Sequence, residues 1–146
     1  MKSYDQDQSL KLFVVMSRAM QSVTKRVEED IKSYGLNPTE FAVLELLYSK
    51  GEQPIQKIGE KVLLASSSIT YVVDKLEKKS FIHRKPCPKD RRVTYAAITE
   101  DGTNLMGDIF PKHREAIQEI FAGLESDEKK ELIIQLKKLG FHAQEL

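Results

Sequence analysis

Cysteine, long hydrophobic runs and net charge are all scarce in this chain of 146 residues. The single cysteine, Cys87, cannot form a disulfide within the chain, which is typical of a reducing compartment. The first ten residues hold no apolar segment like that of a signal peptide, and no stretch is long enough to span a bilayer. We therefore expect a cytoplasmic protein with no disulfide scaffold and no membrane partner.

The net charge is only +1, but the charged residues are unevenly distributed along the chain. Residues 66–92 hold eight Lys or Arg and three acidic residues, a net charge of +5, so the remainder of the chain carries −4. A phosphate-binding surface requires such a local concentration of positive charge, because the positive potential then attracts phosphate at one surface of the protein. A solvated charged face is the alternative interpretation of this stretch.

Apolar residues at helical spacing, with capping residues at the boundaries, predict six helices. Gly35 is expected to end the first helix, Asn37 to cap the second, and Gly140 to end the last. Pro111 should kink or interrupt the fifth helix, because it lacks an N–H and its ring crowds the preceding turn. The expected helices span residues 9–34, 38–50, 55–64, 66–80, 100–122 and 126–140.

A β-hairpin is expected between the fourth and fifth helices. Its strands would span 81–85 and 93–98, where β-branched and aromatic residues are frequent. A tip that only had to turn would favour Asn-Gly or Asp-Gly. This tip instead holds four charged residues, which predicts contact with something outside the protein, and we expect Asp90 to orient Arg92 or Arg91 by an ion pair. The charged tip residues are Lys89, Asp90, Arg91 and Arg92.

The third and fourth helices, joined by a short turn, form a candidate helix-turn-helix. The side of the fourth helix opposite its apolar stripe carries hydroxyls, a tyrosine, an aspartate and lysines. Hydroxyls at a helix N-terminus can donate to phosphates, Tyr and Asp can reach base edges, and Lys adds charge. For Tyr71, half-buried packing is the alternative interpretation. The predicted DNA contacts of this helix are Ser66, Ser67, Ser68, Thr70, Tyr71, Asp74, Lys75 and Lys78.

Three stretches resemble the MarR family of winged helix-turn-helix regulators. They are "GLNPTEFAVLELL", "IGEKVLLASSSITYVVDKLEKKSFIHR" and "DRRVTYAAIT", the last with the family's wing spacing at Asp90, Arg92, Ile98 and Thr99. The resemblance implies a mainly α (α+β winged-helix) fold with six helices and a wing of two to three strands. It also implies that Arg92 enters the minor groove, that Asp90 supports it, and that residues 66–78 contact the major groove.

The resemblance further implies one domain over 1–146, with a winged helix-turn-helix lobe at 37–98 and dimerisation helices at 9–34 and 99–146. Independently of the resemblance, the flanking helices carry many large apolar side chains, which favours a homodimer. They are Leu10, Phe13, Phe110, Ile117, Phe121, Leu132, Leu136 and Phe141. A two-fold dimer should bind double-stranded DNA at an inverted repeat.

The resulting prediction is a sequence-specific DNA-binding transcriptional regulator, most simply a repressor, and not an enzyme. No Ser-His-Asp set, phosphate loop or paired carboxylates are present to support catalysis, and no cofactor is expected. The three histidines share no metal-ligand spacing. The alternative function is a winged-helix module that binds an acidic protein partner through its basic face.

Two regulatory hypotheses stay open. Family resemblance implies a pocket for a small aromatic or phenolic effector, although core packing is the default role of its candidate residues, Phe13, Met16, Met20, Phe41, Met106 and Phe110. Cys87 has basic neighbours that can lower a thiol pKa, so it is either a redox switch or an inert residue at the wing base. Peroxide-sensing relatives use a cysteine near the start of the first helix, where this chain has Leu10, Lys11 and Leu12.

Overall fold

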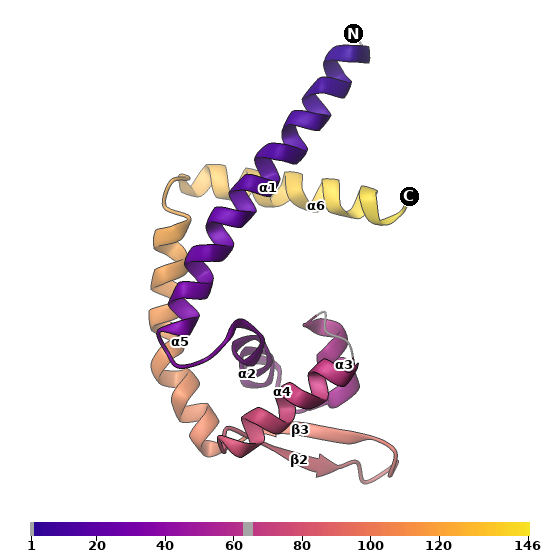
Figure 1. Cartoon of the computed structure of the whole chain (residues 1–146), viewed down its shortest axis with the longest axis vertical. Helices are drawn as coiled ribbons and strands as arrows, with labels where there is room; N and C mark the ends of the chain where they lie inside the picture. The colour runs from indigo at the N-terminus through magenta and orange to yellow at the C-terminus, as the bar shows by residue number, and fades with distance from the viewer. Residues whose placement is uncertain (1, 63–65) are drawn as a thin grey trace.

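The computed structural model describes the backbone of residues 2–62 and 66–146, and the side chains of residues 3–62 and 68–146. Within this part of the chain, six helices and three short strands form a mainly α fold with a small antiparallel sheet, as predicted (Figure 1). In chain order they are α1 (Lys2–Lys32), α2 (Pro38–Lys50), β1 (Gln53–Pro54), α3 (Ile55–Lys61), α4 (Ser66–Lys78), β2 (Ile82–Pro86), β3 (Thr94–Ile98), α5 (Glu100–Ile120) and α6 (Ser126–Gln144).

The boundary between α1 and α2 follows the predicted capping signals. Gly35 has φ +80°, the left-handed conformation that glycine adopts without strain. Asn37 Oδ1 accepts from the Glu40 backbone N–H at 2.8 Å, and Glu40 Oε1 accepts from the Asn37 N–H at 3.0 Å. This capping box satisfies two backbone donors at the start of α2, so local sequence alone determines where the helix begins.

The sheet has the order β1-β3-β2, and both pairings are antiparallel. Ile82 pairs with Ile98 and Pro86 with Thr94, so β2 and β3 form the predicted hairpin. The third strand, β1, has only two residues and pairs Gln53 with Ala96. It ties the segment after α2 to the same sheet that supports the hairpin.

The hydrophobic core lies in the lobe formed by α2, α3, α4 and the sheet, closed by the end of α1 and the first half of α5. Several elements contribute side chains with no exposed surface, among them Val43 and Leu44 of α2 and Val73 and Leu76 of α4. Packing at this density fixes the orientation of α4 relative to the sheet. Other core members are Ile31, Leu36, Phe41, Leu47, Ile58, Ile69, Val72, Ile82, Ala96, Met106 and Ile109.

Several predicted helix boundaries were wrong. α1 starts at Lys2 rather than residue 9, and α5 ends at Ile120. α5 is not interrupted at Pro111, because the buried side chains of Met106, Ile109 and His113 hold the helix on both sides of it. α6 continues past Gly140 to Gln144, since one glycine costs a helix only about 1 kcal/mol relative to alanine. The expected end of the third helix, residues 63–64, lies outside the described residues.

The three long helices extend beyond the winged lobe, although the end of α1 and the first half of α5 contribute to its core (Figure 1). α5 rises from the sheet and packs beside α1, while the N-terminal part of α1 and α6 extend away from the rest of the chain. Their apolar side chains are consequently exposed within one chain, among them Leu10 at 68% and Phe13 at 65%. In the part of the chain that the structure describes, no helix is both long and apolar enough to cross a bilayer.

Candidate nucleic-acid interface

The helix α4 has one buried and one exposed side. Ile69, Val73 and Leu76 are at most 2% exposed and face the core. On the opposite side, Tyr71 is 68% exposed, which contradicts the packing alternative for this residue within a single chain. Ser68, Thr70, Asp74 and Lys78 are also exposed, and Lys75 is half-buried. The predicted side chains of Ser66 and Ser67 lie outside the described side chains, although both residues belong to the first turn of α4.

The hairpin holds its charged tip beyond the sheet. Lys89, Arg91 and Arg92 are exposed, and the Arg92 side chain is 91% exposed. Asp90 Oδ1 accepts from the backbone N–H of Arg92 at 3.0 Å and from its Nε at 3.2 Å. The pKa of the Asp90 carboxyl is lowered, first by this backbone hydrogen bond and then by the Arg92 side chain. The predicted ion pair is thus present, and Asp90 presents a partly neutralised arginine to solvent.

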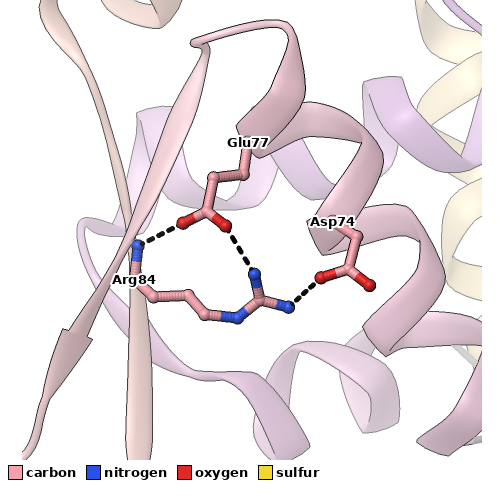
Figure 2. Close-up of polar contacts among 3 residues, drawn as sticks. All are labelled: Asp74, Glu77 and Arg84. Carbon is pink, nitrogen blue, oxygen red and sulfur yellow. Dashed lines mark hydrogen bonds and ion pairs between the residues drawn. The ribbon is translucent and has the colours of Figure 1, made fainter.

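A second arginine joins the wing to α4. The Arg84 side chain leaves β2 and reaches two carboxylates on α4, as Figure 2 shows: Nη2 lies 2.5 Å from Asp74 Oδ1 and Nη1 lies 2.7 Å from Glu77 Oε1. The other oxygen of Glu77 accepts from the Arg84 backbone N–H at 3.2 Å. Burial lowers the pKa of the Arg84 guanidinium, but Asp74 and Glu77 raise it, and the net pKa is raised. Asp74 is therefore exposed but paired.

A buried carboxylate also holds the C-terminal end of α4. Glu40 of α2 is 2% exposed, and its Oε2 lies 2.8 Å from Nζ of Lys79, directly after α4. Burial raises the pKa of Glu40, whereas Lys79 and the Asn37 N–H lower it, with a lowered pKa as the result. The C-terminal half of α4 is thus attached to β2 through Asp74 and Glu77, and the residue after its end is attached to α2.

The six candidate effector-pocket residues are not brought together within one chain. Phe41 and Met106 are buried in the core and Phe110 is half-buried, whereas Phe13 and Met20 are 65% and 60% exposed on the free part of α1. An open groove of about 1000 Å³ between α5 and α6 includes Phe110. Its other lining residues include Glu45, His113, Ile117, Phe121 and Leu132.

A polar network that the sequence prediction missed lies at one wall of this groove. His113 Nδ1 is 2.7 Å from Asp30 Oδ2, and Tyr34 donates its hydroxyl to Asp30 Oδ1 at 2.8 Å. Burial and the Asp30 carboxylate raise the pKa of Tyr34 to about 12. The His113 ring lies 4.5 Å from the ring of Phe41, measured between centroids. The network ties α1 to α5 beside the aromatic residues.

Cys87 follows β2 at the base of the wing tip and is half-buried, with a free thiol. Its backbone N–H donates to the Val93 carbonyl at 3.1 Å.

In the described residues no group of three or more His, Cys, Asp or Glu side chains is placed to hold a metal ion.

Comparison with known proteins places these features in a family. The MarR family model matches residues 36–94, which span α2 to the wing. The HTH-type transcriptional regulator MhqR of Bacillus subtilis (strain 168) is 54% identical over 139 residues, which cover 95% of this chain and 96% of MhqR. The chain belongs to the MarR family. It is accordingly a member of a family of transcriptional regulators, not of enzymes, as the sequence predicted.

Solved MarR structures share the fold over nearly the whole chain. AbsC from Streptomyces coelicolor, a MarR family transcriptional regulator, superposes with a TM-score of 0.86 at 20% identity and covers 96% of this chain and 97% of its own. Sco3205 from the same organism, solved in complex with DNA, gives a TM-score of 0.83 at 17% identity and covers 92% of this chain and 86% of its own. The winged helix-turn-helix fold predicted from the sequence is therefore confirmed.

Local sequence patterns located the exposed face of α4 and the wing, but they did not indicate the residues that hold them in place. Arg84 and Glu77 were counted only as charges, and Lys79 and Glu40 were not connected. The available signal was the i, i+3 spacing of Asp74 and Glu77, which puts two carboxylates on one side of α4 facing a basic strand.

Proposed function

We propose that this MarR protein is a homodimeric repressor that binds an inverted-repeat operator. The exposed side of α4 would lie in the major groove and Arg92 in the adjacent minor groove. The observation that carries the proposal is the hairpin tip, where Asp90 orients an arginine that is 91% exposed. A narrow, A·T-rich minor groove concentrates negative potential and attracts such a guanidinium.

Exposed apolar side chains support the homodimer. On α1 they include Leu10, Leu12 and Phe13, and on α6 they include Ile133 and Phe141, all more than half exposed. Isolated apolar residues are common on surfaces, but a contiguous set along two helices favours a partner surface. A second copy of the chain would cover these helices and project two wings from one body.

The test is selection of double-stranded DNA from a random pool by the purified full-length protein. We expect an enriched inverted repeat, with half-site centres about one helical turn apart, and affinity that falls steeply with salt. Failure to enrich any duplex, even in dilute buffer, would contradict the proposal. It would instead favour the protein-interaction module, whose basic face would bind an acidic protein.

For regulation, we propose that a small aromatic or phenolic molecule releases the operator. The groove between α5 and α6 offers aromatic and aliphatic walls, and the Asp30-paired His113 offers a polar group. Phe13, Met16 and Met20 would reach such a site only from the partner chain or after a movement of α1. A ligand wedged between the dimerisation helices and the winged lobe would change the spacing of the two α4 helices.

The effector is tested by titrating the protein–operator complex with a panel of simple phenols, with cyclohexanol as the non-aromatic control. We expect at least one phenol to dissociate the complex and cyclohexanol to leave it intact. If no phenol weakens operator binding while an oxidant does, thiol modification at Cys87 becomes the better account of regulation.

A further inference from the structure

We propose that Arg84 is a positioning residue for DNA recognition: it sets the wing against α4 through Asp74 and Glu77, and it does not itself contact DNA. This inference rests on the proposed DNA-binding function. It also assigns Asp74 to the support of α4, whereas the sequence alone suggested a base contact. The cluster joins the C-terminal half of α4 to the first strand of the wing (Figure 2).

The geometry of the cluster carries the first step. One residue of β2 makes three polar contacts to α4, two through its guanidinium and one through its backbone N–H. Glu77 accepts at both carboxylate oxygens, from the backbone and from the side chain of the same arginine. Such two-point pairing restricts the rotation of the guanidinium as well as its distance from α4. The cluster therefore fixes how the strand lies along the helix.

The position of Arg84 in the sheet extends this constraint to the wing. Arg84 pairs with Ala96 of β3, which has no exposed surface, so the strand under the guanidinium cannot shift freely. From this point β2 runs directly to the tip that carries Arg92. Major-groove and minor-groove contacts on one duplex have a fixed separation, so the element that joins α4 to β2 determines whether both can form at once.

Charge balance is the second step. Asp74 and Glu77 lie one helical turn apart and would repel each other without a cation between them. Asp74 is 52% exposed on the side of α4 that also carries Lys78, where a lone carboxylate would repel phosphates. Both terminal nitrogens of Arg84 are engaged by these carboxylates, and its side chain is only 29% exposed. Arg84 thus neutralises Asp74 and Glu77 of α4. Because its guanidinium is paired with these two carboxylates, it is not available as a phosphate contact.

The neighbouring residue on the same strand supplies a matched control. Lys85 is 50% exposed, and its Nζ lies 3.0 Å from Glu52, in the segment before β1. Its described ion pair therefore does not involve α4. Arg84→Gln and Lys85→Gln each remove one positive charge at adjacent positions, but only the first releases α4 from the wing.

The experiment compares these two variants as full-length protein on two duplexes, one selected by the wild-type protein from a random pool and one scrambled. We expect Arg84→Gln to lose about tenfold or more in affinity for the selected duplex and to approach its affinity for the scrambled one. On the scrambled duplex, its salt dependence should keep the wild-type slope, because Arg84 itself makes no phosphate contact. Lys85→Gln should retain the wild-type ratio between the two duplexes. Arg84→Lys, which can reach one carboxylate at a time, should recover part of that ratio.

Two outcomes would overturn the inference. One is an unchanged ratio in Arg84→Gln. The other is an equal loss on both duplexes with a slope reduced by about 0.9, which would make Arg84 a phosphate contact. If the wild-type protein selects no duplex at all, the proposed function fails, and that result is distinct from either of these.

Asp74→Asn provides a second measurement if Arg84→Gln does not fold. In a double-mutant cycle with Arg84→Lys, we expect the effects on specific affinity to be non-additive by about threefold or more. Selection with Asp74→Asn should return the wild-type motif with weaker discrimination. A changed base preference at one position would instead make Asp74 a base contact and overturn its supporting role.

Discussion

Nζ of Lys79 lies 2.8 Å from Oε2 of Glu40, and this ion pair connects the end of α4 to the first turn of α2. The carboxylate is 2% exposed and the lysine side chain 34% exposed. The same carboxylate closes the capping box of α2 through Asn37. The residue that directly follows α4 thus stabilises the start of α2 in the core. This pairing gives Lys79 a structural role and distinguishes it from the neighbouring Lys78.

Lys79→Met should destabilise the fold by about 3 kcal/mol, because it leaves the buried carboxylate of Glu40 without its cation. The partial exposure of Lys79 puts this value at the lower end for a buried pair. Lys78→Met is the control: Lys78 is exposed, so the free energy of unfolding should change by less than about 0.5 kcal/mol, while affinity for DNA falls. Urea unfolding measures the free energy of unfolding of both variants. Equal destabilisation by the two substitutions would contradict the structural role of Lys79.

The same pair predicts an acid dependence of stability. The pKa of Glu40 lies below its ordinary value of 4.5, since Lys79 and the Asn37 N–H outweigh burial. A lowered pKa in the folded state means that the carboxylate stabilises the protein above its ordinary pKa, and that this contribution is lost as the pH falls through the folded-state pKa. Between about pH 5 and pH 3 the wild type should therefore lose more stability than Lys79→Met. Parallel curves for the two proteins would exclude Glu40 as the group that titrates.

Gly102, in the first turn of α5, is packed against the start of the wing. A Cβ built there would lie 2.2 Å from the Phe81 carbonyl oxygen and 2.7 Å from the Ile98 side chain. Gly102→Ala should therefore cost about 2 kcal/mol by overpacking. Gly107→Ala, in the same helix, meets only Tyr48 Oη at 3.8 Å and should gain about 1 kcal/mol of helix stability. Thermal unfolding should move in opposite directions in the two variants; a shared direction would refute this packing argument.

The structural features that the sequence predicted correctly depend on residues close together in the chain. The capping box joins Asn37 to Glu40, and the wing pair joins Asp90 to Arg92. Such pairs follow from local geometry once a helix start or a hairpin is recognised. The wing and the exposed side of α4 were located for the same reason.

The contacts that the sequence did not reveal are long-range. Lys79 and Glu40 are 39 residues apart, and His113 and Asp30 are 83 apart. No periodicity specifies which acid meets which base across such distances, because the packing of helices decides it. The candidate effector-pocket residues lie apart within one chain for a related reason: Phe13 and Met20 are exposed on α1, away from the buried Phe41. The pocket itself stays a prediction.

Leu10→Glu should weaken the proposed homodimer. Leu10 is 68% exposed within one chain, so the change should leave the winged lobe folded while placing a charge in the interface. We expect the dimer dissociation constant to rise at least about tenfold, because an uncompensated buried charge is costly. Sedimentation over a range of concentrations measures it, with Lys11→Glu as the adjacent, exposed control. An unchanged dissociation constant would mean that Leu10, near the start of α1, does not lie in the dimer interface.

Cys87→Ser tests the two regulatory hypotheses. The thiol is half-buried beside the backbone contact to Val93, and serine preserves both the size of the side chain and that contact. If a phenol acts non-covalently, the variant should bind the operator and release it at the wild-type phenol concentration. Loss of the phenol response, with operator binding intact, would show that effector sensing requires the thiol.

Arg92→Ala should remove most of the wing's contribution to operator binding and leave the dimer folded. The side chain is 91% exposed and its ion pair with Asp90 lies entirely at the tip, so the core does not depend on it. We expect a loss of about 1–3 kcal/mol in operator affinity, the range for one good groove contact. Arg91→Ala removes the same charge from the neighbouring exposed residue and should mainly lower the salt slope. Anisotropy titrations distinguish the two, and equal small losses in both variants would mean that the tip contributes charge only, without insertion of Arg92 into the groove.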